Sequence, residues 1–236
     1  MQNVAIKKVV VKKGVYPLED KVNRIEKLNV YFDKSHRRDM CTVVLERARE
    51  NLNDVLENVV NACRRAKSRE EARNILNSRL PEHRVARYVC YLLTGLQAMH
   101  DSENLVHRDI QFEKSDFVSL QNILVFDTNT VKIGDFGKTK YHIHGCFDAK
   151  ELDIWSFGLV IYMLLTISHP FESNKREETI RNIVQCEPDL PYIKKVRGGV
   201  SNYAEQLVKR TLCKNPKDRL TASQALYLAK KWEEHA

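Results

Sequence analysis

The chain has 236 residues, of which 43% are hydrophobic and 30% are charged, and this is the composition of an ordinary globular protein with a core. No apolar run approaches the roughly 20 residues that cross a bilayer. The first residues lack the apolar segment of a signal peptide. Length and composition therefore exclude a membrane-spanning chain and favour a soluble, cytoplasmic protein of one large domain or two small lobes.

The formal net charge is +8 and the sequence pI is about 9.1. Basic residues are spread along the chain, with clusters at residues 64–67 and 194–197, and no nucleic-acid-binding motif accompanies them. A solvated surface is the preferred interpretation, and we do not expect specific nucleic-acid binding. The six cysteines are scattered without a C-x-x-C pair, which indicates free thiols in a reducing compartment.

The N-terminal part favours strands around one helix. Residues 4–12 are rich in β-branched side chains and predict a strand, and residues 29–32 and 40–46 predict two more. Between them, residues 18–28 carry apolar side chains at spacings of four, three and three, which is typical of a helix face.

Helices dominate the prediction beyond residue 48. Residues 49–56 indicate a short helix, residues 61–82 an exposed helical insertion, and residues 83–100 a long amphipathic helix. Residues 153–165 are apolar on nearly every side, so we expect this helix in the middle of a domain. An amphipathic helix is predicted for residues 175–186.

The sharpest chemical pattern lies between these helical regions. Asp109 follows His107 and Arg108, Asn122 opens an apolar run, and Asp135 precedes Phe-Gly. Phosphoryl transfer from a metal nucleotide needs one carboxylate to orient a hydroxyl, and a carboxylate with an amide oxygen to hold Mg²⁺. The pattern supplies these three groups.

The combination of Val4-Ala5-Ile6-Lys7, His107-Arg108-Asp109, Asp135-Phe136-Gly137 and Asp153-Ile154-Trp155-Ser156-Phe157-Gly158 resembles eukaryotic protein kinases of the serine/threonine type, over residues 4–232. Leu45-Glu46, Leu52 and Ser168-His169-Pro170-Phe171 resemble most closely the unfolded-protein-response kinase-endoribonuclease family. The resemblance implies a bilobal α+β fold with a reduced β small lobe and hinge at residues 1–48. A mainly helical large lobe would follow at residues 49–236.

The resemblance also implies roles for individual residues. Lys7 would contact the ATP phosphates and pair with Glu19, twelve residues later. Adenine would lie between Ala5 and Leu124, with the backbone of Glu46 to Ala48 binding its edge. Asp109 would orient the substrate hydroxyl and accept its proton, and Asn122 and Asp135 would hold Mg²⁺. The partner would be a protein substrate or a partner kinase. Asp153 would accept hydrogen bonds from the catalytic-loop backbone.

The sequence departs from the kinase pattern at four places. No glycine-rich loop precedes Lys7, and Gln111 stands where a kinase carries a lysine. Asn122 lies thirteen residues after Asp109, so an eight-residue insertion falls within residues 112–121. Asp153 lies only eighteen residues after Asp135, and no Ala-Pro-Glu occurs. Arg219, which resembles that motif's arginine partner, must therefore be exposed or paired elsewhere.

Three functions stay open on this sequence, and enzyme activity is not decided. The first is a protein serine/threonine kinase with weak activity, and the second is a pseudokinase scaffold or decoy without phosphotransfer. The third, less favoured, is a basic nucleic-acid-binding protein. His142, His144 and Cys146 could also be read as a metal cluster, although a short exposed loop is the preferred interpretation.

Overall fold

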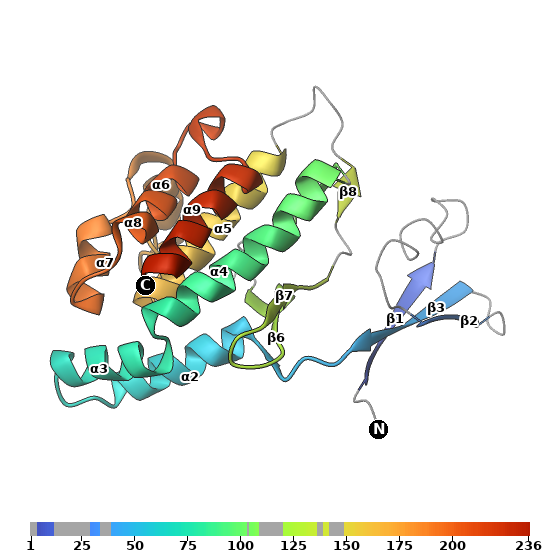
Figure 1. Ribbon diagram of the computed structural model, residues 1–236, viewed down its shortest axis with the longest axis horizontal. Coiled ribbons are helices and arrows are strands. Elements are labelled where there is room, and N and C mark those ends of the chain that lie inside the picture. Colours follow the sequence, from blue (N-terminus) through green and yellow to red (C-terminus); the bar gives the residue numbers. More distant parts are fainter. Residues whose placement is uncertain are drawn as a thin grey trace. The chain divides into compact units, whose positions relative to one another are not determined.

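The computed structural model describes residues 4–11, 29–33, 39–102, 104–108, 120–135, 139–141 and 149–236. The chain divides into two compact units, Met1–Arg49 and Glu50–Ala236. Each unit is considered by itself below. Figure 1 labels the helices and strands of both units.

The first unit contains a three-stranded antiparallel sheet in the order β1-β3-β2. Its strands are β1 (Val4–Val11), β2 (Asn29–Asp33) and β3 (Asp39–Glu46). All three coincide with predicted strands, so that part of the prediction is confirmed. The predicted helix at residues 18–28 lies outside the described residues.

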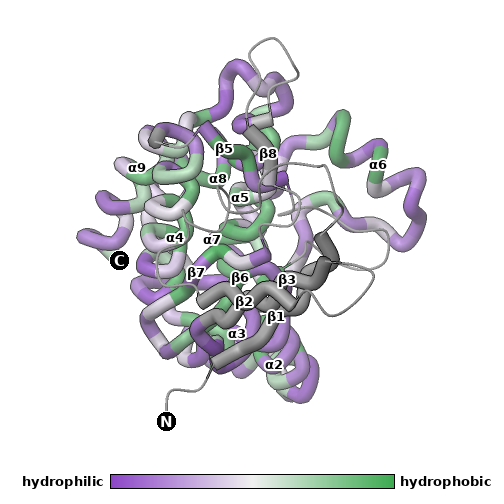
Figure 2. Tube along the Cα trace, turned by 90° about the vertical axis from the view of Figure 1, so that its right-hand side faces the viewer, coloured by the Kyte–Doolittle hydropathy of each residue, from purple (hydrophilic) through white to green (hydrophobic). Residues whose placement is uncertain are grey.

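The second unit is mainly helical (Figure 1). Its helices are α2 (Leu52–Arg64), α3 (Arg69–Arg79), α4 (Glu82–Gln97), α5 (Ala149–Thr166), α6 (Arg176–Gln185), α7 (Leu190–Arg197), α8 (Asn202–Thr211) and α9 (Ala222–His235). Beyond Asp153, helix α5 is mostly apolar, and Phe157, Val160 and Leu164 are fully buried. Figure 2 colours the chain by hydropathy. The prediction that α5 lies inside the domain is confirmed.

Helix α5 also packs closely on α8, and Gly158 permits this contact. A Cβ at Gly158 would lie 2.6 Å from Oγ1 of Thr211 and 2.7 Å from Cδ2 of Leu212. Such distances are shorter than van der Waals contact, so a larger residue would force the two helices apart.

The segment at residues 61–82 differs from the predicted exposed insertion. It completes α2 and forms α3, and Leu76 and Leu80 are 1% and 0% exposed within the hydrophobic core. A helical pattern identifies an apolar face but not the neighbour that covers it, and here the core covers that face. The short helix expected at residues 49–56 is also different, because Glu50–Asn51 is strand β4 and α2 extends to Arg64.

Two small sheets complete the second unit. Strands β4, β6 (Ile123–Val125) and β7 (Val131–Ile133) pair in the order β4-β6-β7, and β5 (Leu105–Val106) pairs with β8 (Lys140–Tyr141). Together the two units have the protein-kinase-like α+β architecture that the resemblance implies, with a reduced sheet and a mainly helical unit.

Two general predictions can be compared with the described residues. Cys63, Cys90, Cys186 and Cys213 are free thiols, as expected, and burial raises the pKa of Cys90 to about 12. Within the described part of the chain, no helix combines the length and the apolar character needed to cross a bilayer.

Candidate functional site

The centre of the candidate site is the carboxylate of Asp153 in the first part of α5, which is 1% exposed. Its Oδ2 accepts the backbone N–H of His107 at 2.8 Å, and its Oδ1 accepts the backbone N–H of Arg108 at 3.0 Å. The buried N–H of His107, the partly buried N–H of Arg108 and the buried carboxylate thus satisfy one another. This clamp is the contact that the kinase resemblance implies, and it fixes the chain immediately before Asp109.

Two further side chains support the clamp, and the sequence analysis missed both. Nε2 of the buried His100 lies 3.0 Å from Oδ2 of Asp153, and a carboxylate oxygen can only accept, so the imidazole donates. Nζ of Lys150 donates to the carbonyl of His100 at 2.6 Å. His100 lies in a five-residue π-helical turn, Ala98–Ser102, that follows α4. A histidine at the end of an apolar helix face was the available signal.

His107 links the clamp to the predicted metal-binding segment. Its side chain is fully buried, and Nε2 donates to the carbonyl of Gly134 at 3.0 Å. A Cβ at Gly134 would lie 2.9 Å from Cδ1 of Leu124, so the position favours glycine. The loop that contains His107 and the end of β7 are therefore held together by a buried hydrogen bond.

The β6–β7 hairpin brings two predicted metal ligands to the same end of a sheet. Ile123 pairs with Ile133, and the N–H of Gly134 donates to the carbonyl of Asn122 at 2.7 Å. Asp135 follows directly. Strand pairing thus places Asn122 and Asp135 at one end of the hairpin, despite the insertion before Asn122.

The opposite end of this hairpin is a tight turn around Asp127. Oδ1 of Asp127 accepts the backbone N–H groups of Asn129 and Thr130, each at 2.7 Å. Hydrogen bonding to the backbone N–H of Asn129 is the main reason why the pKa of Asp127 lies below its ordinary value. The turn fixes the pairing of the strands, and the pairing positions the metal-ligand candidates.

Two residues of the site have left-handed backbone conformations. Arg108 has φ 65° and Asp135 has φ 52°, and both are exposed. This region costs a non-glycine residue about 1–2 kcal/mol, so the surrounding hydrogen bonds must compensate for it. For Arg108 the compensating contact is the bond from its N–H to Asp153.

The other predicted site residues lie in β6, in the first unit or outside the described residues. Leu124 lies in β6 and is partly buried. In the first unit, Ala5 pairs with Leu45 and Lys7 with Val43, Glu46 ends β3, and Ala48 follows it. Glu19 and Asp109 lie outside the described residues, as do Gln111 and the cluster His142, His144 and Cys146.

Arg219 is paired elsewhere, as the sequence analysis requires. Its guanidinium donates to the carbonyls of Cys213, Glu151 and Lys214 at 2.8, 3.0 and 3.2 Å. It also lies 4.8 Å from the centre of the Trp155 ring, which stacks on Phe171, and Nζ of Lys214 lies 4.1 Å from the Phe171 ring. We call Arg219, Trp155, Phe171 and Lys214 the Arg219 cluster.

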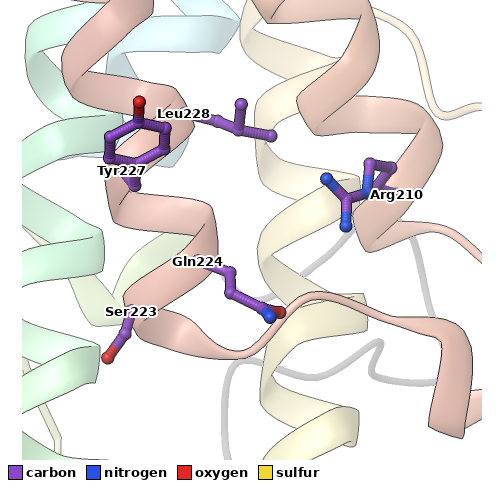
Figure 3. Close-up of a pocket in the computed structure, with 5 residues that line it drawn as sticks. All are labelled: Arg210, Ser223, Gln224, Tyr227 and Leu228. Carbon is purple, nitrogen blue, oxygen red and sulfur yellow. The ribbon is translucent and has the colours of Figure 1, made fainter.

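The remaining candidate features lie away from these groups. A surface depression of about 390 Å³ is lined by Arg210 of α8 and by Ser223, Gln224, Tyr227 and Leu228 of α9 (Figure 3). It includes none of the predicted catalytic residues. Among the described residues, no group of three or more His, Cys, Asp or Glu side chains could hold a metal ion.

Comparison with known proteins agrees with this arrangement. Residues 143–232 match the protein kinase domain family. The chain is 30% identical to the serine/threonine-protein kinase DCLK3 of Mus musculus over 173 residues, which is 64% of this chain and 21% of that protein. It is 30% identical to the serine/threonine-protein kinase PLK4 of Nematostella vectensis over 168 residues, which is 62% of this chain and 16% of that protein.

A plant relative gives a similar result. The chain is 31% identical to the probable serine/threonine-protein kinase CCRP1 of Zea mays over 170 residues, which is 63% of this chain and 25% of that protein. The chain thus spans a quarter or less of the length of these relatives. Residues 143–232 thus carry protein kinase domain sequence, and the chain is similar to serine/threonine-protein kinases.

Proposed function

We propose that this chain belongs functionally with the protein serine/threonine kinases, binds ATP with Mg²⁺, and transfers the γ-phosphate weakly to serine or threonine of a protein. The observation that carries the proposal is the hairpin that gathers Asn122 and Asp135 at one end. The hydrogen bond from His107 to Gly134 joins that end to the clamped catalytic loop.

The residues present suit a hard cation. The side chains of Asn122 and Asp135 offer an amide oxygen and a carboxylate, which are the donors that Mg²⁺ prefers. Held by Asn122 and Asp135, Mg²⁺ would supply positive charge that neutralises the charge developing on the transferred phosphoryl group. Asp109, one residue beyond the clamped N–H of Arg108, would orient the substrate hydroxyl and accept its proton.

The remaining assignments belong to the same proposal. The small lobe and hinge would be residues 1–48 and the large lobe residues 49–236. Lys7 would contact the phosphates with Glu19 as its partner, and Ala5 and Leu124 would pack on adenine. The backbone of Glu46 to Ala48 would bind the adenine edge. The likeness to the unfolded-protein-response kinase-endoribonuclease family and a cytoplasmic location are finer parts of the proposal.

Weak rather than full activity follows from Gln111. A neutral side chain replaces the positive charge that would stabilise the transferred phosphoryl group. The loss of one electrostatic donor at a transition state costs roughly 10²–10³-fold in rate.

A pseudokinase scaffold is the second candidate, and the Arg219 cluster favours it. Three backbone carbonyls occupy the guanidinium donors, so this part of the fold is satisfied without the Ala-Pro-Glu motif that the sequence lacks. A large lobe that is stable without its substrate platform could serve as a binding surface alone.

Nucleotide binding is tested by thermal unfolding of the whole chain with and without Mg-ATP. At a ligand concentration about tenfold above Kd, the stabilisation RT ln(1 + [L]/Kd) is about 1.4 kcal/mol, which is a shift of a few degrees. Asn122→Ala and Asp135→Ala should each reduce the shift, whereas Asp218→Ala, an exposed acid near α9, should not. No shift at millimolar Mg-ATP would overturn ATP binding.

Transfer is tested with γ-labelled ATP and casein. Wild-type protein should label casein slowly, and Asp109→Asn should reduce the label to background. Equal labelling by both proteins, in a chain that binds Mg-ATP, would replace the kinase proposal by the pseudokinase one.

A further inference from the structure

We propose that the α2–α3 turn and helix α7 form a docking surface for an acidic segment of a partner protein. The two basic clusters noted in the sequence, residues 64–67 and 194–197, are 127 or more residues apart in the chain. Helix α3, which follows the first cluster, contacts α7, which carries the second cluster. The proposal concerns a surface separate from the proposed phosphoryl-transfer site. It does not depend on ATP binding or transfer.

Helix α3 is attached directly to α7 by side chains of α3. Nη2 of Arg73 donates to the carbonyl of Lys195 at 3.1 Å, and Nδ2 of Asn77 donates to the carbonyl of Arg197 at 3.1 Å. A Cβ at Gly198, which ends α7 with φ 80°, would lie 3.3 Å from Cδ of Arg73. These contacts place the last residues of α7 against the middle and later part of α3.

The buried side chain of Arg197 stabilises this contact between α3 and α7. Arg197 is 5% exposed, and it donates to the carbonyls of Leu164, Leu165 and Leu80 and to Oδ1 of Asn77. Burial lowers its pKa to about 10, so the guanidinium stays charged at neutral pH. The end of α5, the end of α3 and α7 therefore meet at one side chain. A surface built on such a joint is preorganised, and little ordering cost opposes binding.

Exposed lysine and arginine side chains lie on the α2–α3 turn, on α3 and on α7. Arg69 lies one helical turn before Arg73, and the turn that precedes it is held by Glu71, whose carboxylate accepts the N–H of Lys67 at 2.7 Å. We define the α3–α7 basic surface by these residues: Arg64, Arg65, Lys67, Arg69, Arg73, Lys194 and Lys195. All of them except Arg73 are exposed.

Most of these charges are not neutralised within the chain. Nζ of Lys194 pairs with Glu205 at 2.9 Å. The charged groups of Arg64, Arg65, Lys67, Arg69 and Lys195 form no ion pair with any residue that the structure describes. Like charges on neighbouring elements repel one another, and an acidic ligand would relieve that repulsion.

The chemistry of the surface favours a carboxylate-bearing protein segment. Four of the seven cations are arginines, whose planar forks bind carboxylates through two parallel hydrogen bonds. Glu70 and Glu71 interrupt the positive field, which disfavours a continuous track of phosphates. None of the described exposed large hydrophobic residues lies on this surface, so it offers no platform for base stacking and no apolar wedge for a membrane.

The test measures binding of a fluorescein-labelled peptide of about sixteen residues in which Glu alternates with Gly and Ser, using anisotropy and the whole chain. The charge-reversal variant is Arg64→Glu with Arg65→Glu and Lys195→Glu. The matched control is Lys209→Glu with Lys217→Glu and Lys230→Glu, three exposed lysines elsewhere that give the same change in net charge. Thermal unfolding verifies that both variants fold. If the charge-reversal variant does not fold, Arg64→Gln with Arg65→Gln and Lys195→Gln is used in its place.

We expect the surface variant to raise Kd for the acidic peptide about tenfold or more, and the control variant to raise it less than about threefold. Binding should weaken as salt rises from about 50 to about 300 mM, and a peptide with Gln in place of Glu should not bind. If the two variants raised Kd equally, binding would depend on the net charge of the chain and not on this surface, and the proposal would be overturned. Tighter binding of a 20-base-pair DNA duplex, lost in the same surface variant, would reassign the surface to nucleic acid and overturn it too.

Discussion

Two charged side chains, Asp153 and Arg219, lie at the beginning of α5. Their partners could be predicted from the sequence to very different extents. Asp153 accepts the N–H groups of His107 and Arg108, and these are the contacts that its motif implies. Arg219 resembles a residue whose partner motif is absent from the sequence, and its donors contact three carbonyls instead. A buried charge keeps its predicted contact where the partner is main chain in a short fixed segment. Where the predicted partner motif is absent from the sequence, as for Arg219, neighbouring backbone carbonyls satisfy the donors.

The largest expected effect comes from removing the carboxylate of the clamp. Asp153→Ala leaves two amides and the buried His100 without their acceptor, and it should reduce the free energy of unfolding by about 3–5 kcal/mol. Urea unfolding followed by circular dichroism measures this. Glu177→Ala, an exposed acid in the first turn of α6, should cost under about 1 kcal/mol. Similar losses in both variants would contradict the clamp.

The next effect concerns pH and the histidine beside the Arg219 cluster. His169 is buried, its Nδ1 accepts the N–H of Phe171 at 3.2 Å, and burial lowers its pKa to about 4. An unfolded histidine has a pKa of about 6.5, so between these values the unfolded chain binds a proton that the folded chain does not. The free energy of unfolding should therefore fall by up to about 3 kcal/mol as pH drops from about 6.5 to about 4.

His169→Asn separates this contribution from that of the carboxylates. Its amide oxygen can replace Nδ1 as the acceptor, but it does not titrate. Urea unfolding at several pH values should show a shallower decline for the variant below about pH 6.5. Parallel curves for both proteins would show that His169 is protonated freely in the folded state.

A third substitution tests whether the packing of α5, which serves both regions, is as tight as the Cβ distances indicate. Gly158→Ala should cost about 1–3 kcal/mol because the methyl group would collide with Thr211 and Leu212. Gly95→Ala in α4 is the matched control, since its Cβ would lie 3.4 Å from Ile133. There the better helix propensity of alanine should raise stability by up to about 1 kcal/mol. Equal outcomes would mean that α5 and α8 can separate at little cost.

The smallest effect is expected at Arg219, which is only partly buried. Arg219→Lys should lower the free energy of unfolding by about 1 kcal/mol, because one ammonium group cannot reach three separate carbonyls. Arg210→Lys, on the exposed face of α8, should change it by less than about 0.5 kcal/mol. If Arg219→Lys left the free energy of unfolding unchanged, the Arg219 cluster would be stabilised by a positive charge near the Trp155 ring and not by the three guanidinium hydrogen bonds.

The sequence predicted the parts of this molecule that local patterns determine. The three strands of the first unit, the central position of α5 and the clamp of Asp153 followed from alternation, all-round apolarity and a motif. The burial of Leu76 and Leu80 did not follow, because a helix face does not identify its neighbour. The partners of Arg197 and Arg219 are backbone carbonyls, and every residue type carries one. A backbone carbonyl partner therefore cannot be identified from the residue types in a sequence.

The pairing of Asn122 with Gly134 also bears on how this chain tolerates changes in length. Leu120 is 1% exposed and begins the short 3-10 turn that leads through Asn122 into β6. From that residue onward, the position of Asn122 depends on β7 and the turn at Asp127, not on the number of residues before it. Coding sequence could therefore be gained or lost between Asp109 and Leu120 as a cassette, while the amide stays beside Asp135. A frame-preserving change at that point would leave the pairing of Asn122 with Gly134 in place, although it could alter Gln111.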